Sequence, residues 1–340
     1  MGMRTAQRFV AVVALALVAI PLSSARFRIR YAKVHGRKHL ILKDIAAYYG
    51  MSYRRTGKRS QLSSKYSKLS FEQDKSSATI NGVIIHLSHP VALWKRDAVV
   101  SDADFHQLID PIMRPAALPK RSATRILLDP GHGGRDPGCT VAKVREKDLT
   151  LKIAIATARI LRQKGYIVAY TRSSDRSLSL AERVRIATRW KADVFISIHA
   201  NHVGVSSVTG VETFCLCPRN TPSTYRGKIR KTKSPGHGYN KLNARLAYEV
   251  QKHVKKSTSA RDRGVKHAAF FVLREMPCPA VLLETGYLSN TAERVKLASS
   301  AYQEKVAAGI AAGVVSYRGA LAKGKKPKCR QPSGKDGKSP

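Results

Sequence analysis

Four side chains that can bind a metal ion or carry a proton lie next to predicted secondary-structure elements. His132 lies in a glycine-rich loop that follows a short apolar run, and His199 and Glu284 each come directly after a longer apolar run. Glu146 lies just before a stretch with helical periodicity. The glycines beside His132 allow a sharp backbone turn and leave space around the imidazole. We therefore treat these four residues as the candidate site.

Two histidines and one carboxylate, with a fourth position open, are the usual ligands of a catalytic zinc ion in a peptidase-type site. The remaining carboxylate then acts as a base, which takes a proton from the bound water and returns it to the leaving nitrogen. Taken singly, each residue also has a structural interpretation. His132 fits a solvated turn, His199 a hydrogen-bonded strand end, and Glu146 a helix N-terminus. Their joint occurrence at equivalent strand ends favours a metal site.

The segment that carries these residues alternates apolar strands with amphipathic helices. This alternation predicts an α/β fold with a mostly parallel sheet flanked by helices on both faces. Ligands of such sheets bind beyond the carboxyl ends of the strands, so the four side chains should converge there. Ser179 and Glu182 predict a capping box at one helix start. The predicted strands are 126–128, 166–170, 194–198, 208–216 and 280–283, and the predicted helices are 149–162, 180–190, 242–254 and 302–317.

Residues 26–118 precede this segment and predict a small β-rich module, joined to it by a linker at 119–124. Asn81-Gly82, between two β-rich runs, is a strong hairpin signal. The segment from Ile80 to Pro90 resembles part of a small module found at the N-terminus of some copper amine oxidases and beside some cell-wall enzymes. We expect a candidate wall-binding module without oxidase chemistry.

Residues 1–25 have the pattern of a secretory signal. Arg4 and Arg8 precede an uncharged apolar run that ends at Leu22, and small residues follow at a candidate cleavage site. The alternative is a membrane anchor, but the run is shorter than the roughly 20 residues of a spanning helix. We expect export to the periplasm or to the cell wall and extracellular space, with no transmembrane span in the mature chain.

The chain of 340 residues contains 62 Lys and Arg against 22 Asp and Glu, which gives a net charge of +40. Such a charge attracts polyanions of any kind. Export and the lack of a recognised binding motif argue against nucleic acid as the partner. We expect instead anionic envelope polymers, held by a basic loop at 218–241 and a basic disordered tail at 321–340.

Five cysteines are too few for a disulfide scaffold, and an odd number leaves at least one thiol unpaired. Cys215 and Cys217 lie two residues apart and could bind a metal, but buried thiols or a disulfide agree better with the absence of a CxxC pair. Cys139 lies between two candidate ligands, where a thiol could compete for zinc, and we interpret it as a bystander.

Five blocks in order resemble the zinc-dependent N-acetylmuramoyl-L-alanine amidases, which are peptidoglycan hydrolases. The resemblance covers about 125–317, within a predicted catalytic domain at 125–320, and implies one zinc ion held by His132, Glu146 and His199, with Glu284 as the catalytic carboxylate. The expected reaction cuts the amide between N-acetylmuramic acid and L-alanine. The alternative is a non-catalytic peptidoglycan-binding protein, but all four positions hold competent residues. The blocks are 128–134, 145–148, 197–201, 262–266 and 284–290.

Overall fold

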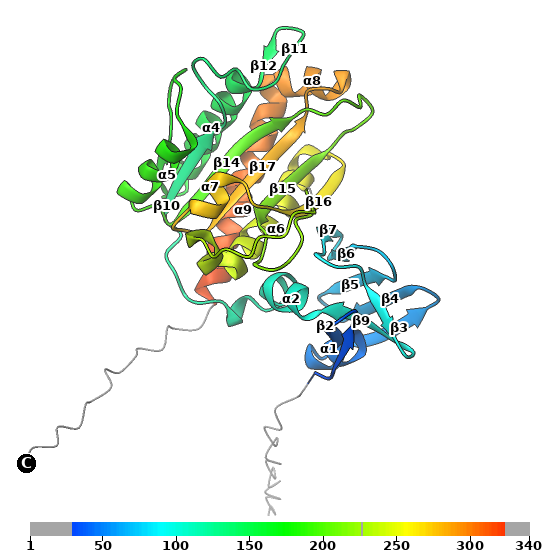
Figure 1. The fold of residues 1–340 in the computed structure, drawn as a ribbon. Coiled ribbons are helices and arrows are strands. Elements are labelled where there is room, and N and C mark those ends of the chain that lie inside the picture. The colour runs from blue at the N-terminus through cyan, green and yellow to red at the C-terminus, as the bar shows by residue number, and fades with distance from the viewer. Residues whose placement is uncertain (1–28, 226, 324–340) are drawn as a thin grey trace, which may run out of the picture.

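The computed structural model describes residues 29–225 and 227–323 (Figure 1). The predicted signal segment and nearly all of the predicted tail therefore lie outside the described residues. Helix α9 extends through Ala322, so the first two residues of the expected tail are helical.

The segment before Arg125 forms two small sheets and short helices. Its elements are β1 (Tyr31–Val34), β2 (Arg37–Ile41), α1 (Leu42–Tyr48), β3 (Ser52–Thr56), β4 (Arg59–Ser63), β5 (Lys68–Glu72), β6 (Ser77–Ile80), β7 (Val83–His86), β8 (Ala92–Trp94), β9 (Asp97–Ser101), α2 (Asp102–Asp104), η1 (Phe105–Ile109), α3 (Asp110–Met113) and η2 (Pro115–Ala117).

The remaining elements follow the predicted alternation of strands and helices. They are β10 (Arg125–Pro130), β11 (Thr140–Val141), β12 (Val144–Arg145), α4 (Glu146–Gln163), β13 (Ile167–Tyr170), α5 (Leu180–Arg189), β14 (Val194–Asn201), β15 (Val211–Leu216), η3 (Pro235–Tyr239), α6 (Asn240–Thr258), β16 (Asp262–Ala268), α7 (Phe271–Glu275), β17 (Ala280–Tyr287), α8 (Thr291–Ala298) and α9 (Ser300–Ala322).

Two local predictions are confirmed by backbone and hydrogen-bond geometry. Asn81 and Gly82 have φ of +49° and +76° and connect β6 to β7, as the Asn-Gly hairpin signal predicts. Ser179 caps α5 by accepting a hydrogen bond from the backbone of Glu182, whose side chain bonds back to complete the capping box. Both features arise from short-range chemistry, so a sequence pattern suffices to predict them.

One mixed sheet runs through both parts of the chain, in the order β13-β10-β14-β17-β15-β16-β7-β6-β5-β4-β3. The prediction of a mostly parallel sheet is therefore corrected. Strand β15 is antiparallel to β17, and the strands from β7 to β3 pair antiparallel. The physical reason is the length of the connections, because a parallel return needs a crossover of a dozen or more residues. Residues 202–210 and the tight hairpin turns are too short for one.

Helices cover both faces of the part of the sheet that lies after Arg125, as predicted. Apolar side chains of α4, α6 and α9 pack on one face, in a core that also includes the inner side of β4–β7. Helices α5 and α7 pack on the other face against alternate residues of β10, β14, β15 and β17. None of the helices in 29–225 and 227–323 combines the length and the apolar character needed to cross a bilayer.

Strand β16, which the periodicity did not predict, connects the two parts of the sheet by pairing with β7 at Val265 and Ile85. The backbone of Ile84 donates to Asp262 Oδ2 at 3.0 Å, and the His86 ring donates from Nε2 to the carbonyl of Arg263 at 3.0 Å. The N-terminal strands are thus hydrogen-bonded to the α/β segment.

The described cysteines are free thiols, and Cys215, Cys217 and Cys278 are buried. Of the two alternatives that the sequence left open for Cys215 and Cys217, the structure therefore has buried thiols. Burial raises the pKa of the Cys278 thiol to about 12, so this thiol is protonated at neutral pH. Within the described residues, the three-residue clusters that could hold a metal ion contain no cysteine.

Candidate metal centre

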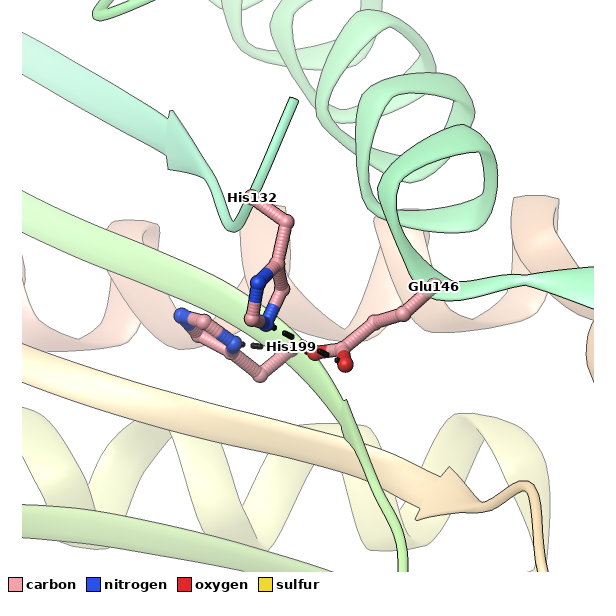
Figure 2. Close-up of side chains that lie close together, drawn as sticks. All are labelled: His132, Glu146 and His199. Carbon is pink, nitrogen blue, oxygen red and sulfur yellow. Dashed lines mark hydrogen bonds and ion pairs between the residues drawn. The ribbon is translucent and has the colours of Figure 1, made fainter. Parts of the chain in front are cut away.

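His132, Glu146 and His199 converge at the carboxyl edge of β10 and β14 (Figure 2). His132 follows β10 with φ of +61°, His199 lies in β14, and Glu146 is the first residue of α4. Each offers one ligand atom, and these atoms lie within 4.8 Å of one another. The structure therefore brings these three residues together, two from strand ends and one from the start of a helix.

The Glu146 carboxylate lies between the two imidazoles. Its Oε2 is 3.2 Å from His132 Nε2, and its Oε1 is 2.9 Å from His199 Nδ1. The backbone N–H groups of Cys139 and Ala200 also donate to this carboxylate, at 3.0 and 3.1 Å. The donors hold a buried side chain in one orientation. Cys139 therefore contributes a backbone donor here, and its thiol is not part of the cluster.

Burial of Glu146 on its own would raise the pKa of its carboxyl group. Hydrogen bonds and charge from His132 and His199 outweigh this effect and hold that pKa well below its usual range. For His132, burial works against protonation, but Glu146 and Asp136 prevail and raise its pKa. A negative carboxylate beside two imidazoles is the charge state that a divalent cation prefers.

Asp136 supports His132 from the side away from Glu146. Its Oδ2 lies 2.7 Å from His132 Nδ1, so Nε2 points toward Glu146. A carboxylate on the far nitrogen of a ligating histidine fixes the ring and its tautomer. Sequence reasoning missed Asp136. The signal that could have revealed it is an acidic residue four positions after the histidine within one tight loop.

A buried ionic network holds the His132 loop against the sheet. Asp129 accepts hydrogen bonds from Thr171, Arg183 and Ser197 at 2.6 to 2.8 Å. Arg183 also donates to the carbonyl oxygen of His132 at 2.8 Å. Asp129 and Arg183 are almost fully buried, so each charge depends on the other for compensation. The sequence did not reveal this network, because its members lie on β10, on α5, on β14 and in the loops after β10 and β13.

Two glycines, Gly131 and Gly138, lie so close to the cluster that a side chain at either position would clash with it. A Cβ on Gly131 would lie 2.3 Å from the His199 ring, and one on Gly138 would lie 2.6 Å from both Glu146 Oε2 and His132 Cδ2. Gly138 also has φ of +65°. Any larger residue at either position would displace a member of the cluster.

Glu284 lies on the neighbouring strand, where it pairs with His199 in the β14–β17 register. Its Oε2 is buried and has no hydrogen-bond partner. Burial raises its pKa well above the ordinary value, and the charges of Glu146 and Glu212 add to this rise. A cation at the adjacent cluster would act in the opposite direction. Glu284 is therefore an unpaired carboxylate beside the three potential ligands.

Two other glutamates that the sequence places close to the sheet, Glu212 and Glu275, are paired. Glu212 is bonded by Lys266 at 2.5 Å, by Arg263 at 3.1 Å and by Asn201 at 3.1 Å. Glu275 lies in α7, before β17 begins and therefore toward the opposite edge of the sheet, and is bonded by its neighbour Arg274 at 2.5 Å. Pairing distinguishes these structural carboxylates from Glu284.

The basic loop after β15 lies away from the cluster. Because β15 is antiparallel to β17, its last residue lies where β17 begins, while Glu284 lies toward the end of β17. The loop also packs on the end of β16, where Thr224 bonds to the carbonyl oxygen of His267. His237 follows within η3 of the same loop. The sheet topology therefore separates His237 and its loop from the edge that carries the cluster.

The donor set fits zinc. Two imidazole nitrogens and one carboxylate oxygen are typical zinc ligands, and His132 and His199 keep a quarter and a fifth of their side-chain surface exposed. Such a cluster at the carboxyl edge of an α/β sheet is typical of metal-dependent hydrolases.

Most of the segment after Arg125 matches a known protein family. Residues 126–316 match the family Amidase_3, described as N-acetylmuramoyl-L-alanine amidase. The chain is 36% identical over 192 residues to the N-acetylmuramoyl-L-alanine amidase LytC of Bacillus subtilis, covering 56% of this chain and 35% of that protein. It is 30% identical over 229 residues to AmiA of Escherichia coli, covering 60% and 79%. The solved catalytic domain of CwlV from Bacillus (Paenibacillus) polymyxa is 34% identical, with 57% and 97% covered and a TM-score of 0.49.

The chain belongs to the N-acetylmuramoyl-L-alanine amidase family, whose members are enzymes that hydrolyse an amide bond of peptidoglycan. The family resemblance inferred from the five sequence blocks is confirmed.

Proposed function

We propose that this protein cleaves the amide bond between N-acetylmuramic acid and L-alanine, with one zinc ion held by His132, Glu146 and His199. Glu284 is the general base in this proposal. The chemistry that bound zinc supplies is a pKa of about 7 for water and polarisation of the scissile carbonyl. Asp136 orients His132, and Glu284 accepts a proton at its free Oε2 and transfers it to the leaving nitrogen.

The observation that carries this proposal is the unpaired Oε2 of Glu284, on the strand that neighbours His199. A buried carboxylate oxygen without a partner is costly unless another group uses it. General-base catalysis uses such an oxygen, because it must be free to accept a proton. We therefore favour the enzyme over a non-catalytic peptidoglycan-binding protein.

Product analysis tests the proposal directly. Purified peptidoglycan is digested with the mature protein, with and without a zinc chelator, and the products are separated and weighed by mass spectrometry. We expect free stem peptides that begin with L-alanine and glycan strands with intact lactyl groups. Chelation should abolish both products, and added zinc should restore them. Cleavage of the glycan chain, or chelator-resistant activity, would contradict the proposal.

We further propose that residues 1–25 are removed during export to the periplasm or the cell wall, and that anionic envelope polymers bind the exposed basic surface. Residues 26–118 would form the accessory module, 119–124 the linker and 125–320 the catalytic domain. N-terminal sequencing of protein from the cell envelope should find a start near Arg26. Intact Met1 on cytoplasmic protein would contradict the export proposal.

A further inference from the structure

The side of β4–β7 that faces away from the core is polar. Alternate residues of these strands, such as Leu62, Leu69 and Ile85, are buried in the core shared with α1 and η1. The residues between them point to the opposite side, since side chains alternate along a strand. One cross-strand row on this outer side is Gln61, Ser70, Thr79 and Ile84.

This outer side forms a shallow hollow of about 560 Å³. Its rim is basic, with Arg59, Lys68 and Lys75 against one acid, Glu72. Glu72 pairs with Arg59 at 3.4 Å, whereas Lys68 and Lys75 form no ion pair with any described residue. The hollow therefore combines hydroxyl and amide groups with two uncompensated positive charges.

The hollow and Glu284 lie on the same face of one continuous sheet. A Cβ on Gly264 would touch the Ile84 side chain at 2.8 Å, so the side of β16 that bears Gly264 is the side that bears Ile84. Lys266, two residues further along β16, shares that side and reaches Glu212 at 2.5 Å. Glu212 in turn pairs directly with Glu284 in the register of β15 and β17.

The distance between Glu284 and the hollow is one that neighbouring parts of a single polymer chain can span. From β17 to β6 the order is β17, β15, β16, β7 and β6, so four steps separate the strands of Glu284 and Thr79. At about 4.8 Å for each step, this separation is roughly 19 Å. A single stem peptide at Glu284 would not fill the hollow, but the neighbouring part of the same polymer would reach it.

We propose that the outer face of β4–β7 is an extended subsite for the peptidoglycan strand, next to the stem that is cleaved. Lys68 and Lys75 bind carboxylates of neighbouring stem peptides, Gln61, Ser70 and Thr79 bond to sugar hydroxyl and amide groups, and Ile84 supports a sugar face. The inference rests on the proposed function, because it takes peptidoglycan as the substrate. It adds that the N-terminal strands take part in substrate binding.

The test compares polymeric peptidoglycan with a soluble monomeric muropeptide that is too short to reach the hollow. Two variants alter the subsite, the double variant Lys68→Glu/Lys75→Glu and the blocking variant Ser70→Trp, which places a strand-compatible ring in the hollow. Lys152→Glu/Lys305→Glu makes the same charge change at exposed positions of α4 and α9, which pack on the other face of the sheet, and serves as the matched control. Circular dichroism and thermal unfolding establish that each protein is folded.

We expect both subsite variants to raise KM for the polymer by about tenfold, with kcat and KM for the monomer unchanged. The control should change polymer KM by no more than about twofold. Equal kinetics of wild type and both variants on the polymer would overturn the inference. An equal loss in the control would also overturn it, because the effect would then come from net charge alone.

Failure of the proposed function would look different. In that case the wild type would not release peptide from the monomer, while cosedimentation with insoluble peptidoglycan would still report on the hollow. Weaker cosedimentation of both subsite variants, with normal cosedimentation of the control, would support the subsite independently. Equal cosedimentation of all four proteins would reject it.

Discussion

Three glutamates near the carboxyl edge of the sheet have the same carboxylate group but different hydrogen-bond and ion-pair partners. Glu146 lies between two imidazoles, Glu212 is paired with two cations, and Glu284 keeps one oxygen without a partner. The first arrangement suits a metal ligand, the second a structural ion pair and the third a base. This difference leads to distinct expectations for each residue.

Replacing Glu284 with Gln should lower the rate of amide hydrolysis by roughly 100- to 10,000-fold, because the base is lost, while zinc content stays at one per chain. Glu146→Gln should lose both zinc and activity, since a neutral amide is a poorer ligand. The measurements are peptide release and metal content by mass spectrometry. Glu275→Gln is the control, and it should cleave normally. Loss of metal from Glu284→Gln protein would invalidate the assignment.

Arg183 should matter for stability because it compensates the buried charge of Asp129. We expect Arg183→Ala to lower the free energy of unfolding by about 3–5 kcal/mol, measured by urea denaturation. The control is Arg185→Ala on the same helix, whose pair with Glu182 is exposed and 3.9 Å long. That change should cost less than about 1 kcal/mol. Similar losses in both variants would show that helix α5, rather than the ion pair, carries the effect.

At the scale of elements, the pairing of β7 with β16 joins the N-terminal strands to the α/β segment in one sheet. The sequence predicts these two parts of the chain as separate units. Gly264 makes this contact with φ of +84°, and a Cβ there would lie 2.7 Å from the carbonyl oxygen of Ile84. A side chain at this position would therefore push the two strands apart. Gly82, with φ of +76°, has no atom within 4 Å of its Cβ position and provides a comparison.

We expect Gly264→Ala to lower the free energy of unfolding by about 2–4 kcal/mol, because steric conflict adds to backbone strain. Gly82→Ala should cost about 1 kcal/mol from strain alone. Chemical denaturation of both variants measures the difference, which isolates the strand junction. Equal losses would mean that β7 and β16 tolerate separation.

At the scale of the whole molecule, the main feature is the large net positive charge. Removal of residues 1–25 takes away two arginines and no acids, so the net charge falls from +40 to 40 minus 2, or +38. The basic loop lies at the edge of the sheet opposite the metal-binding cluster, as the antiparallel pairing of β15 and β17 requires. Attachment to an anionic envelope through this loop would leave the cluster free to face the substrate.

Binding of the mature protein to isolated cell envelopes should fall steeply with salt. The screening length shortens from roughly 10 Å at 0.1 M salt to 3 Å at 1 M, so the attraction between exposed lysines or arginines and the anionic polymer weakens. Cosedimentation across this range measures the effect, and sucrose at matched osmolarity is the control. Binding that stays constant with salt would indicate a specific pocket in place of general charge attraction.

Local patterns in the sequence were sufficient for the parts of this protein that depend on neighbouring residues. Alternation of apolar runs predicted the α/β segment, Asn81-Gly82 predicted its hairpin, and Ser179 with Glu182 predicted a capping box. The residue types at strand ends also identified His132, His199 and Glu284 as one candidate site, because parallel strands present their carboxyl ends at one edge.

Only the tertiary structure decided which strands pair across long stretches of chain and which charges remain unpaired. The contact of β7 with β16, the mixed direction of the sheet and the position of the basic loop all depend on non-local pairing. The roles of Asp136 and Arg183, and the lone oxygen of Glu284, depend on side chains brought together from different elements. The spacing of apolar residues in a segment depends on which of its faces is buried, and it is therefore visible in the local sequence. The pairing of strands that are distant in the sequence depends on the free energy of the whole assembled sheet.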